Sequence, residues 1–217
     1  DVNVIAISNW LNDLGIKLEE VRVIPDKEVS IVKTVNEVRK RFNYIFTTGG
    51  IGPTHDDITS QSIAKAFNLS YNYHKEAFTI LKKYYGEKKF NEGRRKMTKL
   101  PKNALLIYNP LSAAPGFIVD NVHCLPGVPS ILKSMLGGLK KRLIGGRKIF
   151  SKTLNLITVE SEIAFPLKSV QNKFKDTEIG SYPFFKKGKI GVSIVIRSTE
   201  KKLITKCSKE IVRFVKK

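Results

Sequence analysis

Cysteine is scarce in this 217-residue sequence, which contains only Cys124 and Cys207. Two cysteines exclude a framework of several disulfides, and no Cys/His spacing is typical of a zinc site. The longest apolar runs, such as 154–159, contain polar residues and are far shorter than the roughly 20 residues of a membrane-spanning helix. The first residues lack the basic and apolar segments of a signal peptide. We therefore expect a reduced, soluble, cytoplasmic protein without a membrane partner.

Acidic residues are also few, because 19 Asp and Glu stand against 39 Lys and Arg, which gives a formal net charge of +20 at pH 7. Such an excess attracts anions, among them nucleic acids, nucleotides and phosphorylated pterins. The basic residues are spread along the whole chain, and aromatic residues are not interleaved with Arg as in a stacking platform. This distribution argues against a dedicated nucleic-acid binder. A Lys-rich codon bias or solubility is the favoured cause of the charge, and an anionic partner, such as a nucleotide or a phosphorylated pterin, is the alternative.

Apolar periodicity predicts that helices and strands alternate along the first two thirds of the chain. The expected elements are a helix over 3–15, a strand over 18–24, a helix over 27–41, a strand over 44–47, a helix from about 57, helical residues over 74–98, strands over 105–108, 116–119 and 122–125, and a helix to about 139. This order is typical of an α/β fold, and we expect a three-layer α/β/α arrangement with a mostly parallel sheet.

Gly145-Gly146 marks the expected boundary between two domains, 1–146 and 147–217. The second domain shows strand-like alternation over 151–158 and 190–197 and helical spacing over 160–174 and 200–215. We expect a small α+β domain in which the elements follow the order β-α-β-β-α.

The segment 47–59, Thr-Thr-Gly-Gly-Ile-Gly-Pro-Thr-His-Asp-Asp-Ile-Thr, lies between a predicted strand and a predicted helix. Its glycines permit positive φ angles, and its N–H groups, with those of the following helix, can form an anion site. Ligands of open α/β sheets bind at the carboxyl ends of strands, where this loop must lie. The loop is neither a Walker motif nor a Gly-x-Gly-x-x-Gly fingerprint, and a turn without a ligand is the alternative.

Two adjacent carboxylates, Asp56 and Asp57, stand at the end of this loop. Capping of the following helix is one interpretation of such residues. Beside a phosphate site, however, they repel an anionic ligand unless a cation neutralises them, and Mg²⁺ binds carboxylate, water and phosphate oxygens. We hypothesise that Asp56 and Asp57 bind a divalent metal such as Mg²⁺ or Co²⁺, and that they are catalytic if the protein is an enzyme.

The residues 48–59 closely resemble the signature of the molybdopterin-binding (MoCF-biosynthesis) domain family, in its CinA-like branch. This branch is also similar to the N-terminal domain of eukaryotic FAD synthase. Four further stretches agree with the family in the same order along the chain: 23–26, 109–117, 125–129 and 179–183. The resemblance spans most of the chain.

The resemblance implies a set of ligand-binding residues: Thr48, Gly49, Gly50, Gly52, Thr54, Asp26, Asn109, Pro115 and Gly116. It places Asp57 on an acidic position that binds metal or polarises the ligand. Arg95 and Lys96 stand where the family carries basic residues that can pair with phosphate, and a solvated helix face is the usual alternative for such a run. Turn formation is the alternative role for the Asn and Pro positions. Tyr182 is interpreted as a core residue in preference to a stacking residue.

The function implied by the resemblance is the binding of a phosphorylated pterin, with molybdopterin as a candidate ligand, or of a nucleotide. The alternative is a divalent-metal-dependent pyrophosphatase that acts on ADP-ribose or FAD. Relatives commonly form dimers or trimers, so a homo-oligomer is expected. Family members usually begin with a strand and an acidic loop before Asp-x-Asn, and this sequence begins at Asp1-Val2-Asn3. We therefore expect the first strand and its carboxylate to be missing, either because the sequence is part of a longer chain or because the sheet lacks a strand. Their absence favours binding over catalysis.

Overall fold

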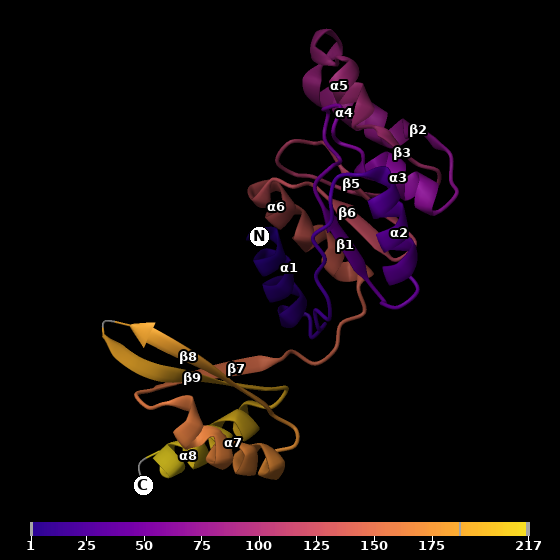
Figure 1. Ribbon diagram of the computed structural model, residues 1–217. Coiled ribbons are helices and arrows are strands. Elements are labelled where there is room, and N and C mark those ends of the chain that lie inside the picture. The colour runs from indigo at the N-terminus through magenta and orange to yellow at the C-terminus, as the bar shows by residue number, and fades with distance from the viewer. Residues whose placement is uncertain (1, 187, 216–217) are drawn as a thin grey trace. The chain divides into compact units, whose positions relative to one another are not determined.

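The computed structural model describes residues 2–186 and 188–215 (Figure 1). The chain forms two compact units. The first contains the residues up to Trp10 and Leu18–Ile144, and the second contains Leu11–Lys17 and the residues from Gly145 onward. The described residues contain no helix with the length and apolar character that crossing a membrane requires.

The first unit is built from helices on both sides of a central sheet. Its helices are α1 (Val2–Asp13, of which the residues after Trp10 belong to the second unit), α2 (Glu28–Val38), α3 (Thr59–Ala66), α4 (Lys75–Tyr85), α5 (Glu92–Lys96) and α6 (Pro129–Leu139), with 3-10 turns η1 (Glu87–Lys89) and η2 (Lys140–Arg142). Its strands are β1 (Ile45–Thr48), β2 (Tyr71–Tyr73), β3 (Lys99–Pro101), β4 (Leu105–Ile107), β5 (Gly116–Val119) and β6 (Val122–Leu125). Helices α1 and α6 lie on one side of the sheet, and α2 and α3 lie on the other (Figure 1). The predicted α/β class and three-layer arrangement are thus confirmed.

The central sheet has the strand order β1-β6-β5-β4 and is mixed in direction. Strand β1 pairs with β6 in parallel, whereas β5 is antiparallel to both β6 and β4. The expectation of a mostly parallel sheet is therefore met only at the β1–β6 pair. The reason is the short connection at Asp120 and Asn121, because a parallel pair needs a crossover of a dozen or more residues.

The core of this unit lies between the sheet and helices α2 and α3. Ile31 and Val35 of α2 and Ile63 of α3 pack with Phe117 and Val122 of the sheet, and all five side chains are buried. Helical spacing in α2 and alternation in β5 direct these residues to the same layer. The packing fixes the beginning of α3, and hence the end of the glycine loop that precedes it.

The strand predicted over 18–24 is wrong, because this segment has no regular secondary structure and pairs with no strand among the described residues. Val23 is 92% exposed, so the apolar alternation does not reflect a buried face. The segment is instead held by charge: Arg22 donates hydrogen bonds to Glu37 at 2.6 and 2.9 Å and pairs with Glu20. The Arg22 guanidinium lowers the pKa of Glu37 to about 2.

The strands β2 and β3 form a separate antiparallel ribbon that the sequence analysis did not predict. Each strand has only three residues, and β3 ends at Pro101. Runs this short carry almost no periodic signal.

The second unit contains β7 (Phe150–Leu156), α7 (Glu160–Lys173), β8 (Glu178–Lys186), β9 (Lys189–Ser198) and α8 (Lys201–Val215). The predicted order β-α-β-β-α is confirmed. The three strands form an antiparallel sheet in the order β7-β9-β8, and both helices pack on one face of it (Figure 1). Ile194 and Ile196 of β9 are buried beneath Val170 of α7 and Ile211 of α8.

His123 of β6 lies in the first unit with 3% of its surface exposed, stacked on the ring of Phe46 at 4.9 Å. Burial lowers its pKa, because the charged imidazolium loses hydration. Unfolding restores a pKa of about 6.5, so the unfolded chain binds more protons below that pH. We therefore predict that the free energy of unfolding falls as the pH drops from 7.5 to 5.5.

This prediction is measured by urea unfolding, followed through the fluorescence of Trp10, whose ring contacts Phe46. His123→Gln should show a weaker pH dependence than the natural protein, and exposed His55→Gln should show the same dependence. If the free energy of unfolding depends equally on pH in all three proteins, His123 is not the cause of its fall at low pH.

Candidate functional site

The candidate site lies where the parallel strands β1 and β6 end. Because they run in the same direction, the loops that follow Thr48 and Leu125 leave from one edge of the sheet. The N–H of Gly49 donates to the carbonyl of Leu125 at 2.9 Å and extends the pairing into the loop. A Cβ atom on Gly127 would lie only 3.4 Å from Gly49 Cα, so two loop backbones approach closely here.

The glycine loop is held in a conformation that other residues rarely adopt. Gly49 has φ +95° and Gly50 has φ +68°. A Cβ atom on Gly50 would lie 2.1 Å from Thr59 Oγ1, and the N–H of Thr59 donates to the carbonyl of Gly50 at 2.8 Å. The contact between Gly50 and Thr59 therefore fixes the loop against the first residue of α3.

Three successive amides of this loop are open to an external acceptor. Within the described part of the chain, no atom accepts a hydrogen bond from the backbone N–H of Gly50, Ile51 or Gly52. These three residues are only partly buried. Consecutive amides of this kind at the end of a strand, followed by the N-terminus of a helix, are suited to bind an anion.

Asp57 is engaged within the loop. Its Oδ2 accepts a hydrogen bond from the Thr54 backbone N–H at 2.8 Å and another from the Thr54 hydroxyl. The carboxylate also lies over Gly52, where a Cβ atom would be 2.7 Å from Oδ2. The N-cap position of α3 is Ile58 and has no side-chain cap, so Asp57 closes the 54–57 turn and does not cap the helix.

Asp56 is exposed beside this turn. The Thr54 hydroxyl and the backbone N–H of Asp56 stabilise its charged form and lower its pKa, with a smaller effect from His55 and Lys96. Asp56 is therefore charged at neutral pH. In the described residues, no group of three or more His, Cys, Asp or Glu side chains could hold a metal. A cation held by Asp56 and Asp57 would therefore need phosphate or water oxygens for its remaining ligands.

Helix α5 contacts the same loop. Lys96 Nζ donates to the backbone carbonyl of Thr54, and a Cβ atom on Gly93 would lie 3.4 Å from Pro53. The preceding basic residue, Arg95, is held by Phe90, with its guanidinium 5.7 Å from the ring centroid and a hydrogen bond to the carbonyl. Lys96 is therefore the basic residue of α5 that reaches the acidic turn.

The loop after β4 leaves from the same edge of the sheet, because β4 runs in the same direction as β6 and β1. The Asn109 side chain uses all its hydrogen bonds within this loop. Its Nδ2 donates to Ser112 Oγ at 2.7 Å and to the carbonyl of Ala114 at 2.9 Å, and its Oδ1 accepts from two backbone amides. Asn109 therefore shapes the loop that ends at buried Pro115.

Gly116 and Asp26 are the remaining predicted positions. Gly116 is buried in the sheet, where a Cβ atom would lie 2.4 Å from the carbonyl of Cys124. Asp26 is exposed in the turn before α2. The predicted residues that lie together are Thr48 at the end of β1 and, in the loop after it, Gly49, Gly50, Gly52, Thr54, Asp56 and Asp57.

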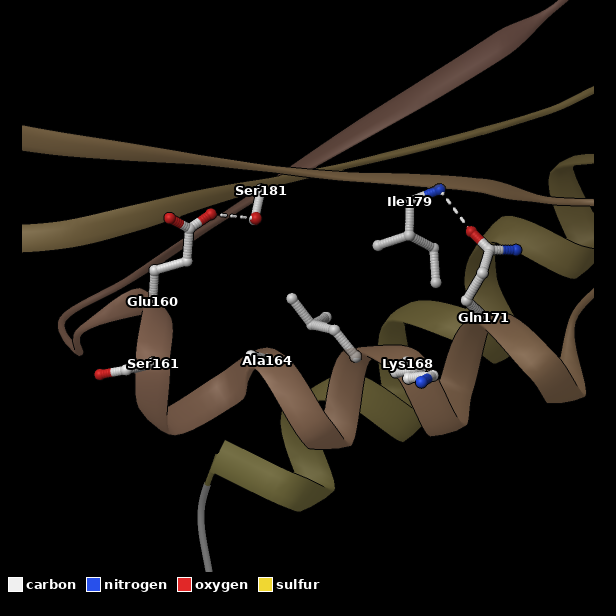
Figure 2. Close-up of a pocket in the computed structure, with 8 residues that line it drawn as sticks. Glu160, Ser161, Ala164, Lys168, Gln171, Ile179 and Ser181 are labelled. Carbon is white, nitrogen blue, oxygen red and sulfur yellow. Dashed lines mark hydrogen bonds between the residues drawn. The ribbon is translucent and has the colours of Figure 1, made fainter.

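A groove of about 630 Å³ lies in the second unit, between α7 and β8 (Figure 2). Glu160 accepts a hydrogen bond from the Ser181 hydroxyl at one end, and Gln171 Oε1 accepts one from the Ile179 backbone N–H at 2.9 Å at the other. The sequence analysis did not predict this groove, because periodicity shows that α7 and β8 form but not how the helix packs against the strand.

Residues 1–144 match the family described as "Probable molybdopterin binding domain". The chain belongs to this family. Residues 148–217 match a second family, described as "FAD synthase, middle domain". Both matches agree with the resemblance that the sequence motifs predicted.

A protein of Archaeoglobus fulgidus is 32% identical to this chain, over 93% of the chain and 85% of that protein. A CinA-like protein of Prochlorococcus marinus (strain MIT 9215) is 31% identical over 94% of the chain, which spans about half (51%) of that relative's length. The crystal structure of the protein CinA from Thermoplasma acidophilum, of unknown function, is 30% identical with a TM-score of 0.61. The match covers 64% of this chain and 85% of that chain.

Gly50 provides a test of the loop geometry. We predict that Gly50→Ala lowers the free energy of unfolding by about 2 kcal/mol or more, because positive φ alone costs roughly 1–2 kcal/mol and the new Cβ meets Thr59. Gly137→Ala is the control, since nothing lies within 4 Å of its Cβ position inside α6. That variant should be neutral or more stable by up to about 1 kcal/mol. Urea unfolding measures both, and equal effects would contradict the loop geometry.

Proposed function

We propose that this chain binds a phosphorylated small molecule, either a pterin such as molybdopterin or a nucleotide, at the loop of Gly49–Thr54. The observation that carries the proposal is the run of open amides at Gly50, Ile51 and Gly52. An anionic phosphate satisfies such donors with charge-assisted hydrogen bonds, which are stronger than those between neutral groups. Membership of the molybdopterin-binding family supports this choice of ligand class.

A divalent cation such as Mg²⁺ or Co²⁺ is part of the proposal. Asp56 and Asp57 would hold it, and the cation would neutralise a phosphate bound by the loop amides. Asp57 Oδ2 accepts a hydrogen bond from the Thr54 N–H, which holds the turn in place, and Asp56 remains exposed. Lys96, next to the same turn, adds positive charge on the side of α5.

Hydrolysis of a diphosphate bond, as in ADP-ribose or FAD, is the second candidate function. It is favoured by the acidic pair beside the anion site and by the likeness of residues 148–217 to the FAD synthase middle domain. A bound cation would stabilise charge on the diphosphate and lower the pKa of an attacking water. The chain itself would contribute the loop amides, which orient the diphosphate, and the two carboxylates, which hold the cation.

Removal of one charge from the acidic pair should change the affinity for ADP-ribose in opposite directions without and with a divalent cation. We predict that Asp56→Asn binds ADP-ribose several-fold more tightly than the natural protein in EDTA, because a charge that repels the phosphates is gone. With Mg²⁺ or Co²⁺, the same variant should bind ADP-ribose several-fold more weakly. Titration calorimetry measures both conditions. Asp120→Asn is the control, because Asp120 lies in the turn between β5 and β6, at the opposite edge of the sheet.

Release of AMP from ADP-ribose and FAD distinguishes binding from catalysis. If the second candidate function is correct, AMP forms only with a divalent cation, and Asp57→Asn reduces its rate at least tenfold while Asp120→Asn does not. If ADP-ribose binds but no AMP is released, the binding function is supported and the pyrophosphatase function is excluded. Equal affinity of the natural protein and Asp56→Asn in both EDTA and metal would overturn the proposed site.

A further inference from the structure

Helices α7 and α8 both pack on one face of the three-stranded sheet of the second unit, and neither of them covers the other face (Figure 1). Alternation along β9 directs Ile194 and Ile196 to the helices, so Ser193, Val195 and Arg197 lie on the other face. The strand register places residues of β7 and β8 beside them on the same face: Ser151, Thr153, Asn155, Glu178, Gly180, Tyr182 and Phe184. We call this surface the open face.

Two aromatic rings lie on the open face, at alternate positions of β8. A Cβ atom on Gly180 would lie 2.9 Å from the ring of Tyr182, and one on Gly191 would lie 2.4 Å from the ring of Phe184. The glycines therefore provide the space in which the rings rest against the sheet. Tyr182 is 50% exposed, so the sequence-based interpretation of it as a core residue is wrong.

Charge and polarity around the rings favour an anionic partner. Lys186 and Lys189 form the last pair of the β8–β9 hairpin, close to Phe184 in the chain, and both are exposed. Arg197 is exposed at the far end of the open face, where Glu178 opposes it as the acidic residue. The whole chain has a formal net charge of +20, so it repels a second copy of itself and attracts a polyanion.

We propose that the open face binds single-stranded nucleic acid, with bases stacked on Tyr182 and Phe184. Residues two apart on a strand are separated by about 6.6 Å, which allows each ring to take one base of an unpaired strand. Lys186 and Lys189, at the end of the hairpin, contact the phosphates. Ser193 lies beside Tyr182, and its hydroxyl donates a hydrogen bond to Asn155 at 2.8 Å. Bases inside a duplex are stacked on one another and do not reach these rings.

The sequence analysis disfavoured nucleic acid because aromatic residues are not interleaved with Arg along the chain. The fold changes this conclusion, because strand alternation places Tyr182 and Phe184 on one face and the hairpin brings Lys189 beside them. The inference is independent of the glycine loop, since every residue it uses lies in the second unit.

The test uses the full chain and fluorescein-labelled oligothymidylate and oligouridylate of about 12 nucleotides, a length within known single-strand site sizes. Fluorescence anisotropy measures the dissociation constants. The double variant Tyr182→Ala/Phe184→Ala should weaken binding at least tenfold, because stacking contributes roughly 1–3 kcal/mol per base. Phe185→Ala is the matched control, since Phe185 is 74% exposed but points to the opposite face, and it should change binding less than twofold.

Further variants separate stacking from a loss of structure. Tyr182→Phe keeps the ring and should bind as the natural protein does, and thermal unfolding establishes that each variant is folded. The slope of affinity against salt should be similar for the natural protein and the double variant, because the phosphate contacts remain. A duplex of the same length should bind more weakly than the single strand.

Three results would overturn the inference. The first is that the natural protein binds neither oligonucleotide. The second is that the Tyr182→Ala/Phe184→Ala variant binds as tightly as Phe185→Ala. The third is that sedimentation shows an oligomer for the natural protein but not for the double variant, while both bind the oligonucleotides equally. The open face would then be an interface between copies of the chain.

Discussion

The parallel pairing of β1 with β6 is the constraint on which the candidate site depends. It directs two loops, after Thr48 and after Leu125, to the same edge of the sheet. The bond from Gly49 to Leu125 continues the pairing by one residue, and the next amides then leave the ladder without an acceptor in the described chain. The proposed anion site is thus a consequence of where the strand pairing ends. Its acidic turn is closed by Thr54 and Asp57 and is supported by Lys96.

Much of this site could be predicted from the sequence, because glycine, Asp and Thr in the 48–59 loop act locally. Glycines mark positive φ, and a strand before the loop places it at the sheet edge. The contact of Lys96 with Thr54 could not be derived in this way, since the two residues are 42 positions apart and their meeting depends on how α5 packs. The commitment of Asn109 to its own loop likewise depends on backbone geometry that residue types do not specify.

The errors in the fold have similar physical origins. Residues 18–24 alternate like a strand, but a strand needs a partner, and here Arg22 is held by Glu20 and Glu37 instead. The antiparallel direction of β5 followed from its short turn to β6, which was a local signal that could have been used. In the second unit the element order was predictable from periodicity. The exposure of Tyr182 was not, because it depends on which face of the sheet the helices cover.

The central claim is that the amides after β1 bind phosphate, and amide resonances of the nitrogen-15-labelled chain test it most directly. Titration with ADP-ribose in the presence of Mg²⁺ should shift the resonances of Gly50, Ile51 and Gly52 more than those of residues in β2 or β3. Inorganic phosphate should shift the same resonances at higher concentration. If ADP-ribose leaves these three resonances unmoved, or moves only residues outside the loop, the account of the site is contradicted.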